Sequence, residues 1–410
     1  MRFGCSFVMA GLIKIGIVFI FLILLTFKKV SLWVCLFAST VLLGLLFHLS
    51  VGRIALDMLS AALEKNTLLL MGALIAILFF SNLMKETGRM DEIMEGFRHI
   101  LKDIRVVIAL LPSMIGLLPI VGGALVSAPM VVAGSDELKL SAERRTFINY
   151  WFRHVWEYTL PTYPAFILAA AVMEIPVRRL SWVNLPLTPV AILGGAIAGF
   201  WGVSKSTRAF DPSAKAASLR RLLENLSPLL FALVLVIGFK VELAYALGMA
   251  IGGMVFLFRI GREKIFKGFR ASLDIELLLT VLAIMSFKKV LETSQAITSI
   301  AGSLSTSGVP VPVIAMVIPF LIGFMTGYGI ATIGIALPIL APFLKDHPQF
   351  VGYMALGFTS GFCGMMLSPF HLCLVLTKDY FGANWKGIFR LAILPTVFIL
   401  LVRLLMTLFL

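Results

Sequence analysis

Long apolar runs separated by short, mostly basic loops make up almost the whole chain. A helix needs roughly 20 apolar residues to cross a bilayer, and most of the runs approach or exceed that length. They lie at about 8–27, 30–50, 66–83, 105–133, 147–174, 186–203, 226–239, 241–258, 273–291, 310–343, 349–377 and 388–410. The pattern predicts an all-α polytopic membrane protein, multi-pass in the cell (plasma) membrane.

Two runs hold too much proline and glycine for straight spanning helices. The run at about 106–132 contains Pro112, Gly116, Pro119, Gly122, Gly123 and Pro129, and the run at about 310–343 contains Pro310, Pro312, Pro319, Gly323, Gly327, Gly329, Gly334, Pro338 and Pro342. Irregular backbone at membrane depth needs protein or a cavity around it. We therefore expect two re-entrant hairpins, each entering and leaving on one side, and about ten transmembrane helices.

Loop charges set the orientation of this topology. With two hairpins, about two thirds of the 35 basic residues fall on the side reached after the first helix. Basic loops face the cytoplasm, so both termini are predicted outside. If either odd run crossed the membrane once, the basic loops would scatter over both sides.

Composition excludes a soluble protein. Of the 410 residues 60% are hydrophobic and 14% charged, with mean hydropathy +1.01. The net charge of +14 lies in short loops, so we interpret it as a topology signal and expect no nucleic-acid partner. The four cysteines show no metal-ligand spacing and are interpreted as small free hydrophobes.

Matching interruptions recur in the two halves of the chain. Residues 83–88 resemble 289–294, residues 111–116 resemble 318–323, and residues 160–164 resemble 365–369, in that order. Because the two hairpins open on opposite sides, the halves are predicted to be inverted repeats. We expect the first repeat at 1–203, a cytoplasmic linker at 204–225 and the second repeat at 226–410.

The run at about 147–174 carries the strongest site signal. Arg153, His154 and Glu157 stand at membrane depth, where charges are expensive and functional, and Pro161 and Pro164 break the helix behind them. An arginine fork suits a carboxylate or phosphate, and His154 and Glu157 can relay a proton. Alternatively, Arg153 and Glu157 neutralise each other. A His-x-x-Glu metal pair is a weaker alternative.

The hairpin turns are the second candidate site. Glycine lets backbone amides approach a ligand, and hydroxyls nearby add hydrogen bonds. We expect substrate contacts from Gly122, Gly123, Ser127, Thr326, Gly327, Gly329 and Thr332. The alternative is that these glycines serve only close helix packing.

The second broken helix, at about 349–377, offers uncharged polar groups instead. Ser360, Ser368 and His371 are expected to contact the substrate. Carbonyls and hydroxyls also suit a coupling cation, with Thr359, Ser360, Gly122 and Gly329 as candidate contacts; no firm metal ligands and no cofactor are expected. His371 as an ordinary packed histidine is an equal alternative.

Residues 122–130, 149–158 and 367–374 carry a family resemblance. The chain resembles the ion transporter superfamily, which includes gluconate, lactate, citrate and divalent-anion permeases. Within it, the chain is most similar to an uncharacterised integral membrane family known as a domain of unknown function. The resemblance implies scaffold and transport domains, a homodimer and elevator-type alternating access. The divalent-anion branch carries Ser-Asn-Thr at both hairpin turns, and this chain does not, so neither sodium coupling nor dicarboxylate binding carries over.

These observations predict a secondary active transporter of a small organic anion of the carboxylate type, coupled to Na⁺ or H⁺, and not an enzyme. The rival class is a membrane-embedded enzyme or lipid-headgroup-handling protein that uses Glu157 and His154. A passive channel would need a polar stripe along several helices, and polarity occurs only at the breaks. The chain lacks a phosphate-binding Gly-x-x-x-x-Gly-Lys-Ser/Thr motif, which argues against ATP-driven transport.

Overall fold

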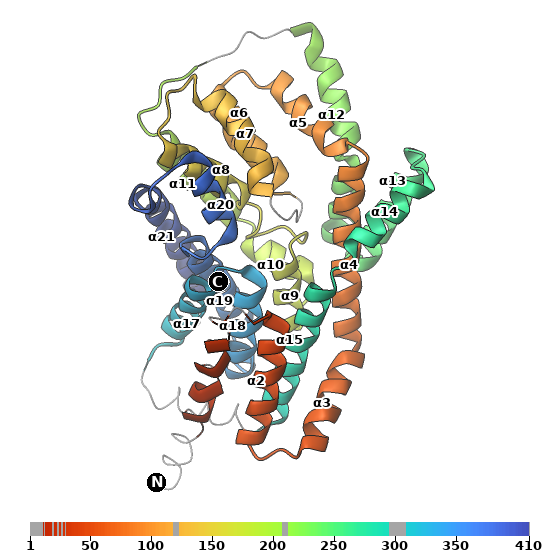
Figure 1. The fold of residues 1–410 in the computed structure, drawn as a ribbon, viewed down its shortest axis with the longest axis vertical. Coiled ribbons are helices and arrows are strands. Elements are labelled where there is room, and N and C mark those ends of the chain that lie inside the picture. The colour runs from red at the N-terminus through yellow and green to blue at the C-terminus, as the bar shows by residue number, and fades with distance from the viewer. Residues whose placement is uncertain are drawn as a thin grey trace.

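The computed structural model describes residues 11–409, except 12, 19, 23, 26, 27, 29, 118–122, 207–211 and 295–308. Throughout the described part the regular structure is helical (Figure 1). The helices of the first half are α2 (Leu32–Leu46), α3 (Val51–Leu63), α4 (Lys65–Glu86), α5 (Arg89–Ile100), α6 (Ile104–Ile115), α7 (Gly123–Ser135), α8 (Ala142–Arg153), α9 (Pro164–Val172), α10 (Val177–Asn184) and α11 (Leu187–Phe200).

The second half continues with the same mixture of long and short helices. They are α12 (Pro212–Leu233), the π-helix η1 (Val234–Gly238), α13 (Leu243–Leu257), α14 (Arg262–Ser272), α15 (Ile275–Thr293), α17 (Val311–Thr326), α18 (Gly329–Leu344), α19 (Phe350–Met366), α20 (Leu372–Phe381) and α21 (Trp385–Phe409). Because α12 begins at Pro212, most of the predicted 204–225 linker is helical.

Several helices have the length and composition of membrane spans. Among the described residues, Lys65–Glu86, Ala216–Gly238 and Trp385–Phe409 are each long and apolar enough to cross a bilayer, and the pair α10 and α11, bent by 44°, qualifies as one broken span. Others are apolar but shorter: α2, α6, α7, α13, α17, α18 and α19. An all-helical chain of this kind is a polytopic membrane protein, as the hydrophobic pattern predicted.

The two proline- and glycine-rich runs each form a pair of short helices. With 12 to 16 residues per helix, α6, α7, α17 and α18 are about 18–24 Å long, short of the roughly 30 Å hydrocarbon core. Helix α6 packs on α7, and α17 on α18. Figure 1 shows the first pair in the upper half of the molecule and the second in the lower half. These lengths and positions fit re-entrant hairpins.

The helical structure is interrupted within both of the runs at about 147–174 and 349–377. Helix α8 ends at Arg153 and the chain becomes helical again at Pro164, the first residue of α9. Helix α19 ends at Met366, and α20 begins at Leu372. Proline explains where α9 begins, because it lacks an N–H and is favoured at the first residue of a helix.

Two amphipathic helices, α3 and α14, lie between the apolar runs, in stretches that the sequence analysis assigned to loops. Each directly precedes a long helix, and each packs against the long helix of the other half, α3 on α15 and α14 on α4. Their polar faces are paired: Lys267 Nζ lies 2.8 Å from Glu86 Oε2, and Thr293 donates to Asp57 at 2.7 Å. A search for long apolar runs misses such helices because only one face is apolar.

The orientation predicted from the loop charges can be tested directly. Arg179 and Lys264 are both exposed, and the charge pattern places Arg179 outside and Lys264 inside. In intact cells, a membrane-impermeant maleimide should label Arg179→Cys and spare Lys264→Cys. The parent protein, whose Cys35 and Cys363 are buried, gives the background. Equal labelling of the two variants, or the reverse pattern, would contradict the topology.

Candidate functional site

The two helix breaks meet in the interior. The imidazole rings of His154, from the first break, and His371, from the second, have centroids 5.0 Å apart. The ring of Tyr150 lies against both, at 4.8 Å from His154 and 5.3 Å from His371. All three side chains are buried. The predicted site residues of the two halves are therefore neighbours at this point.

Side chains from α10 and α11 satisfy the backbone of the first break. The amide of Asn184 donates to the carbonyl of Tyr158 at 3.0 Å, and the hydroxyl of Thr188 donates to the carbonyl of Val155 at 3.1 Å. The Thr159 and Thr188 hydroxyls are 2.7 Å apart. Buried carbonyls released by a broken helix need such partners, so the break is a defined, hydrogen-bonded structure.

Arg153 is the last residue of α8, and it is only 7% exposed. Its Nη1 atom lies 3.4 Å from the sulfur of Cys373 in α20. The first residue of α7, Gly123, packs directly on the guanidinium, since a methyl group there would lie 2.7 Å from Nη2 and 3.0 Å from Nε. The guanidinium is thus held among α7, α8 and α20.

His154 and Glu157 are neighbours, but they lie in a turn beyond the end of α8 and not, as the spacing had predicted, on one helix face. His154 Nε2 lies 3.7 Å from Glu157 Oε1, and its Nδ1 lies 2.8 Å from the carbonyl oxygen of Tyr150. A carbonyl can only accept, so Nδ1 carries the proton and Nε2 faces the carboxylate. Because α8 ends at Arg153, the four-residue spacing from Arg153 to Glu157 no longer places them on one helix face. This weakens the interpretation of Arg153 and Glu157 as a helical ion pair.

The second break is stabilised by the hydroxyl of Ser368, which lies within it, and by packing against Gly327 of the second hairpin. Ser368 Oγ accepts from the amide of Phe370 at 3.2 Å. Gly327, with φ of 61°, ends α17, and a methyl group on it would lie 2.7 Å from the amide nitrogen of His371. The Tyr150 hydroxyl donates to the carbonyl of Met366 at 3.0 Å. The second hairpin and the first broken helix therefore both contact this break.

The other predicted hydroxyls mostly bond to nearby backbone. Ser127 donates to the carbonyls of Gly123 and Ala124, Thr359 to Ala355, and Ser360 to Met316. The hydroxyl oxygens of Thr326 and Thr332 lie 3.0 Å apart, and the Thr332 hydroxyl donates to the carbonyl of Tyr328. Gly329 begins α18, where a methyl group would lie 3.3 Å from the Ala165 side chain, a tight contact, and 3.4 Å from the Met365 sulfur. Gly122 lies outside the described residues.

Cys373 is the site residue that the sequence analysis missed. It was interpreted as a small hydrophobe, whereas its sulfur contacts Arg153 and lies close to His154 and His371. The one signal in the sequence is its position two residues after His371, immediately beyond the break.

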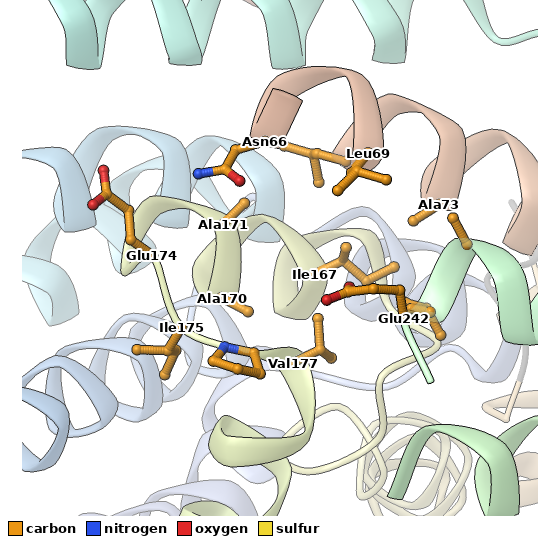
Figure 2. Close-up of a pocket in the computed structure, with 14 residues that line it drawn as sticks. Asn66, Leu69, Ala73, Ile167, Ala170, Ala171, Glu174, Ile175, Val177 and Glu242 are labelled. Carbon is orange, nitrogen blue, oxygen red and sulfur yellow. The ribbon is translucent and has the colours of Figure 1, made fainter. Parts of the chain in front are cut away.

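A cavity of about 250 Å³ lies away from both breaks (Figure 2). Half of its lining residues belong to α4 and α9, and the others come from residues 174–177 and 242–244. Figure 2 shows the carboxylates of Glu174 and Glu242 on opposite sides. None of its lining residues comes from residues 154–163 or 367–371. We therefore regard it as a gap between α4 and α9, separate from the candidate site.

The sequence of residues 8–410 matches a family model described as "Protein of unknown function (DUF401)". The chain belongs to this family. No curated protein matches it. The fold of this DUF401 protein is similar to the crystal structure of the YdaH transporter of Alcanivorax borkumensis, described as having an unusual topology, with a TM-score of 0.63 and 14% sequence identity, over 87% of each chain.

The two comparisons support different conclusions. The match to the DUF401 model confirms the predicted uncharacterised family, while kinship with the gluconate and citrate permeases stays an expectation. At 14% identity, the likeness to YdaH shows a shared fold only. The DUF401 protein is a polytopic helical membrane protein with a transporter-like fold, and its function has to be argued from its own site.

Proposed function

We propose that this protein is a secondary active transporter of a small organic anion of the carboxylate type, coupled to sodium or protons. The observation that carries the proposal is the buried guanidinium of Arg153, held between the first hairpin and both broken helices. A planar guanidinium binds a carboxylate through two parallel hydrogen bonds. Hairpins and breaks at membrane depth are the places where transporters bind their substrates.

The position of Gly123 supports a site that closes over its substrate. The glycine lies so close to the guanidinium that a methyl group on it would require the Arg153 side chain to shift. In this packing the start of α7 covers Arg153, and the anion enters when the hairpin moves away. Residues that line the substrate are then expected from both halves: Arg153, His154, Glu157, Gly123 and Ser127 from the first, and Thr326, Gly327, Gly329, Thr332, Ser360, Ser368 and His371 from the second.

Correspondence between the halves supports inverted repeats and alternating access. Gly116 in the first hairpin and Gly323 in the second occupy matching sequence positions. A methyl group on Gly116 would overlap the carbonyl oxygen of Arg153, and one on Gly323 would overlap that of Gly361. Each hairpin thus packs at its matching glycine on the backbone of the next helix. The first hairpin is proposed to open inward and the second outward.

The packing of the other helices supports a proposed division into scaffold and transport parts. Helices α2, α3 and α15 pack together, and α13 and α14 each pack on α4. We assign all six to a scaffold that forms the homodimer. The hairpins and broken helices form the moving part of an elevator. The 250 Å³ cavity between α4 and α9 lies on the proposed boundary between these parts.

The coupling ion is sodium or a proton. The pair His154–Glu157, 3.7 Å apart, supports a proton, because two titratable groups in contact can pass one between them. The hydroxyls of Thr359 and Ser360 donate to carbonyls, which leaves their oxygens as candidate ligands for sodium.

A thermal-shift screen of organic anions, with and without sodium, tests the function. Ligand binding raises the unfolding temperature of a purified protein by mass action. We expect a carboxylate to stabilise the protein and to be accumulated by proteoliposomes under a sodium or proton gradient. Stabilisation by a lipid headgroup together with its chemical conversion would contradict transport and support the enzyme class. Stabilisation only by cations or neutral solutes would contradict anion binding.

A further inference from the structure

Three metal-binding side chains gather where the two breaks meet. His154 and His371 each offer a ring nitrogen and Cys373 its sulfur, and these atoms all lie within 4.8 Å of one another. Both histidines are buried, and Cys373 is partly buried. The first ligand comes from one half of the chain and the other two from the second, so the cluster exists only in the folded molecule.

One histidine has the hydrogen bond of a metal ligand, and the other has a buried nitrogen without a hydrogen-bond partner in the described part of the chain. His154 donates its Nδ1 proton to the Tyr150 carbonyl at 2.8 Å, which leaves Nε2 as a lone-pair donor. A backbone carbonyl on the opposite ring nitrogen is the usual partner that fixes a metal-binding histidine. His371 is 6% exposed, and its buried Nδ1 has no hydrogen-bond partner among the described residues. A buried polar atom of this kind calls for a partner.

The ligand types indicate the metal. Two imidazoles and a thiolate suit Zn²⁺ and similar thiophilic ions and do not suit Na⁺, Mg²⁺ or Ca²⁺, which prefer oxygen. Zn²⁺ binds nitrogen at about 2.0–2.1 Å and sulfur at about 2.3 Å, so tetrahedral ligands lie about 3.3–3.7 Å apart. The cluster has to contract by about 1 Å, which side-chain rotation can provide.

Charge around the cluster is mixed. The guanidinium of Arg153 lies 3.4 Å from the Cys373 sulfur, and the carboxylate of Glu157 lies 3.7 Å from His154 Nε2. A thiolate at Cys373 and the carboxylate together offset part of the positive charge of a divalent ion beside Arg153. Three protein ligands leave a fourth position open, as in zinc sites that accept an outside ligand.

We propose that His154, His371 and Cys373 form a binding site for Zn²⁺ that ties the two broken helices together. The site does not depend on anion transport. If transport is the function, Zn²⁺ holds the two breaks of the moving part in the contact described above.

Cobalt is the probe, because Co²⁺ replaces Zn²⁺ and gives a sulfur-to-cobalt charge-transfer absorption band when a cysteine binds it. We expect the metal-free full-length protein in detergent to bind one Co²⁺ with this band, and Zn²⁺ to displace it. Cys373→Ser should lose the band. His371→Gln should weaken Zn²⁺ binding by at least ~10-fold, because mutation of a residue that only hydrogen-bonds to a metal ligand already has an effect of that size. The matched control is Cys363→Ser, which removes a buried thiol from α19 outside the cluster and should keep the band.

Absence of the band in the wild type, its persistence in Cys373→Ser or its loss in Cys363→Ser would overturn the proposal. X-ray absorption of the Zn²⁺-loaded wild type provides a test that needs no variant to fold. One sulfur neighbour at about 2.3 Å with nitrogen neighbours near 2.0 Å supports the site, and a shell without sulfur refutes it. These measurements involve no transported anion, so their failure would leave the transport proposal standing.

Discussion

The double variant Arg153→Met with Glu157→Gln is expected to fold and to lose anion binding and uptake. Removing both charges leaves neither ion unpartnered in the interior, so the fold survives. Each hydrogen bond between a guanidinium and a carboxylate contributes about 1.5–3 kcal/mol, and two of them correspond to a loss of about 100-fold or more in affinity. Ligand-induced thermal stabilisation and proteoliposome uptake, measured with the best anion from the screen, check the result.

Two further variants sharpen this experiment. Arg153→Lys keeps the charge and loses the planar fork, so we expect a folded protein with most of its affinity gone. Arg403 provides a matched control, because it is also buried and donates to the carbonyl of Val183 and the side chain of Asn184. Arg403→Lys should lower the unfolding temperature and leave anion affinity unchanged. Wild-type stabilisation of the double variant by the anion would remove Arg153 from the site and restore the explanation that Arg153 and Glu157 only pair.

The variant Gly323→Ala is expected to lower the yield and the unfolding temperature of the protein sharply. Its new methyl group would overlap the carbonyl oxygen of Gly361 and lie 2.9 Å from the amide nitrogen of Met365. These backbone atoms of α19 cannot rotate away as a side chain does, so α17 and α19 must separate. Overpacking of this kind costs about 1–3 kcal/mol or more. Thermal unfolding of the purified variant measures the effect.

Gly253→Ala is the control for this prediction. It adds the same methyl group inside helix α13, where no heavy atom outside the helix backbone lies within 4 Å. Alanine is the better helix former there, so we expect unchanged or slightly higher stability. If Gly323→Ala unfolds at the same temperature as Gly253→Ala, the tight contact between α17 and α19 does not exist in the protein.

The helix breaks were predictable because their causes are local. Proline removes a backbone donor at any position. A charged residue within an apolar run indicates a polar site without any knowledge of the fold. Pro161 and Pro164 mark the first break, and Arg153, His154 and Glu157 identify it as a polar site. The nearness of His154 to Glu157 followed from their three-residue spacing, although a turn rather than a helix brings them together.

What the sequence could not provide was the partner of each group across the fold. The contact of Cys373 with Arg153 and the meeting of His154 with His371 depend on how two distant helices pack, and no local spacing encodes this. The same holds for Ser360, which was expected to face a ligand and donates to the carbonyl of Met316. Hydroxyls in apolar helices bond equally well to backbone or to substrate, so residue type alone does not decide.

The link from Tyr150 to Met366 constrains the order of events during synthesis. The two residues are 216 positions apart, and Arg153 and Cys373 are 220 apart. At about 5–20 residues per second, a ribosome needs about 10–40 s to supply the second partner after the first. During that interval the polar groups of the first break are already made and lack these contacts. The nascent first half therefore has to wait in the membrane, or be sheltered by the insertion machinery, until the second half arrives.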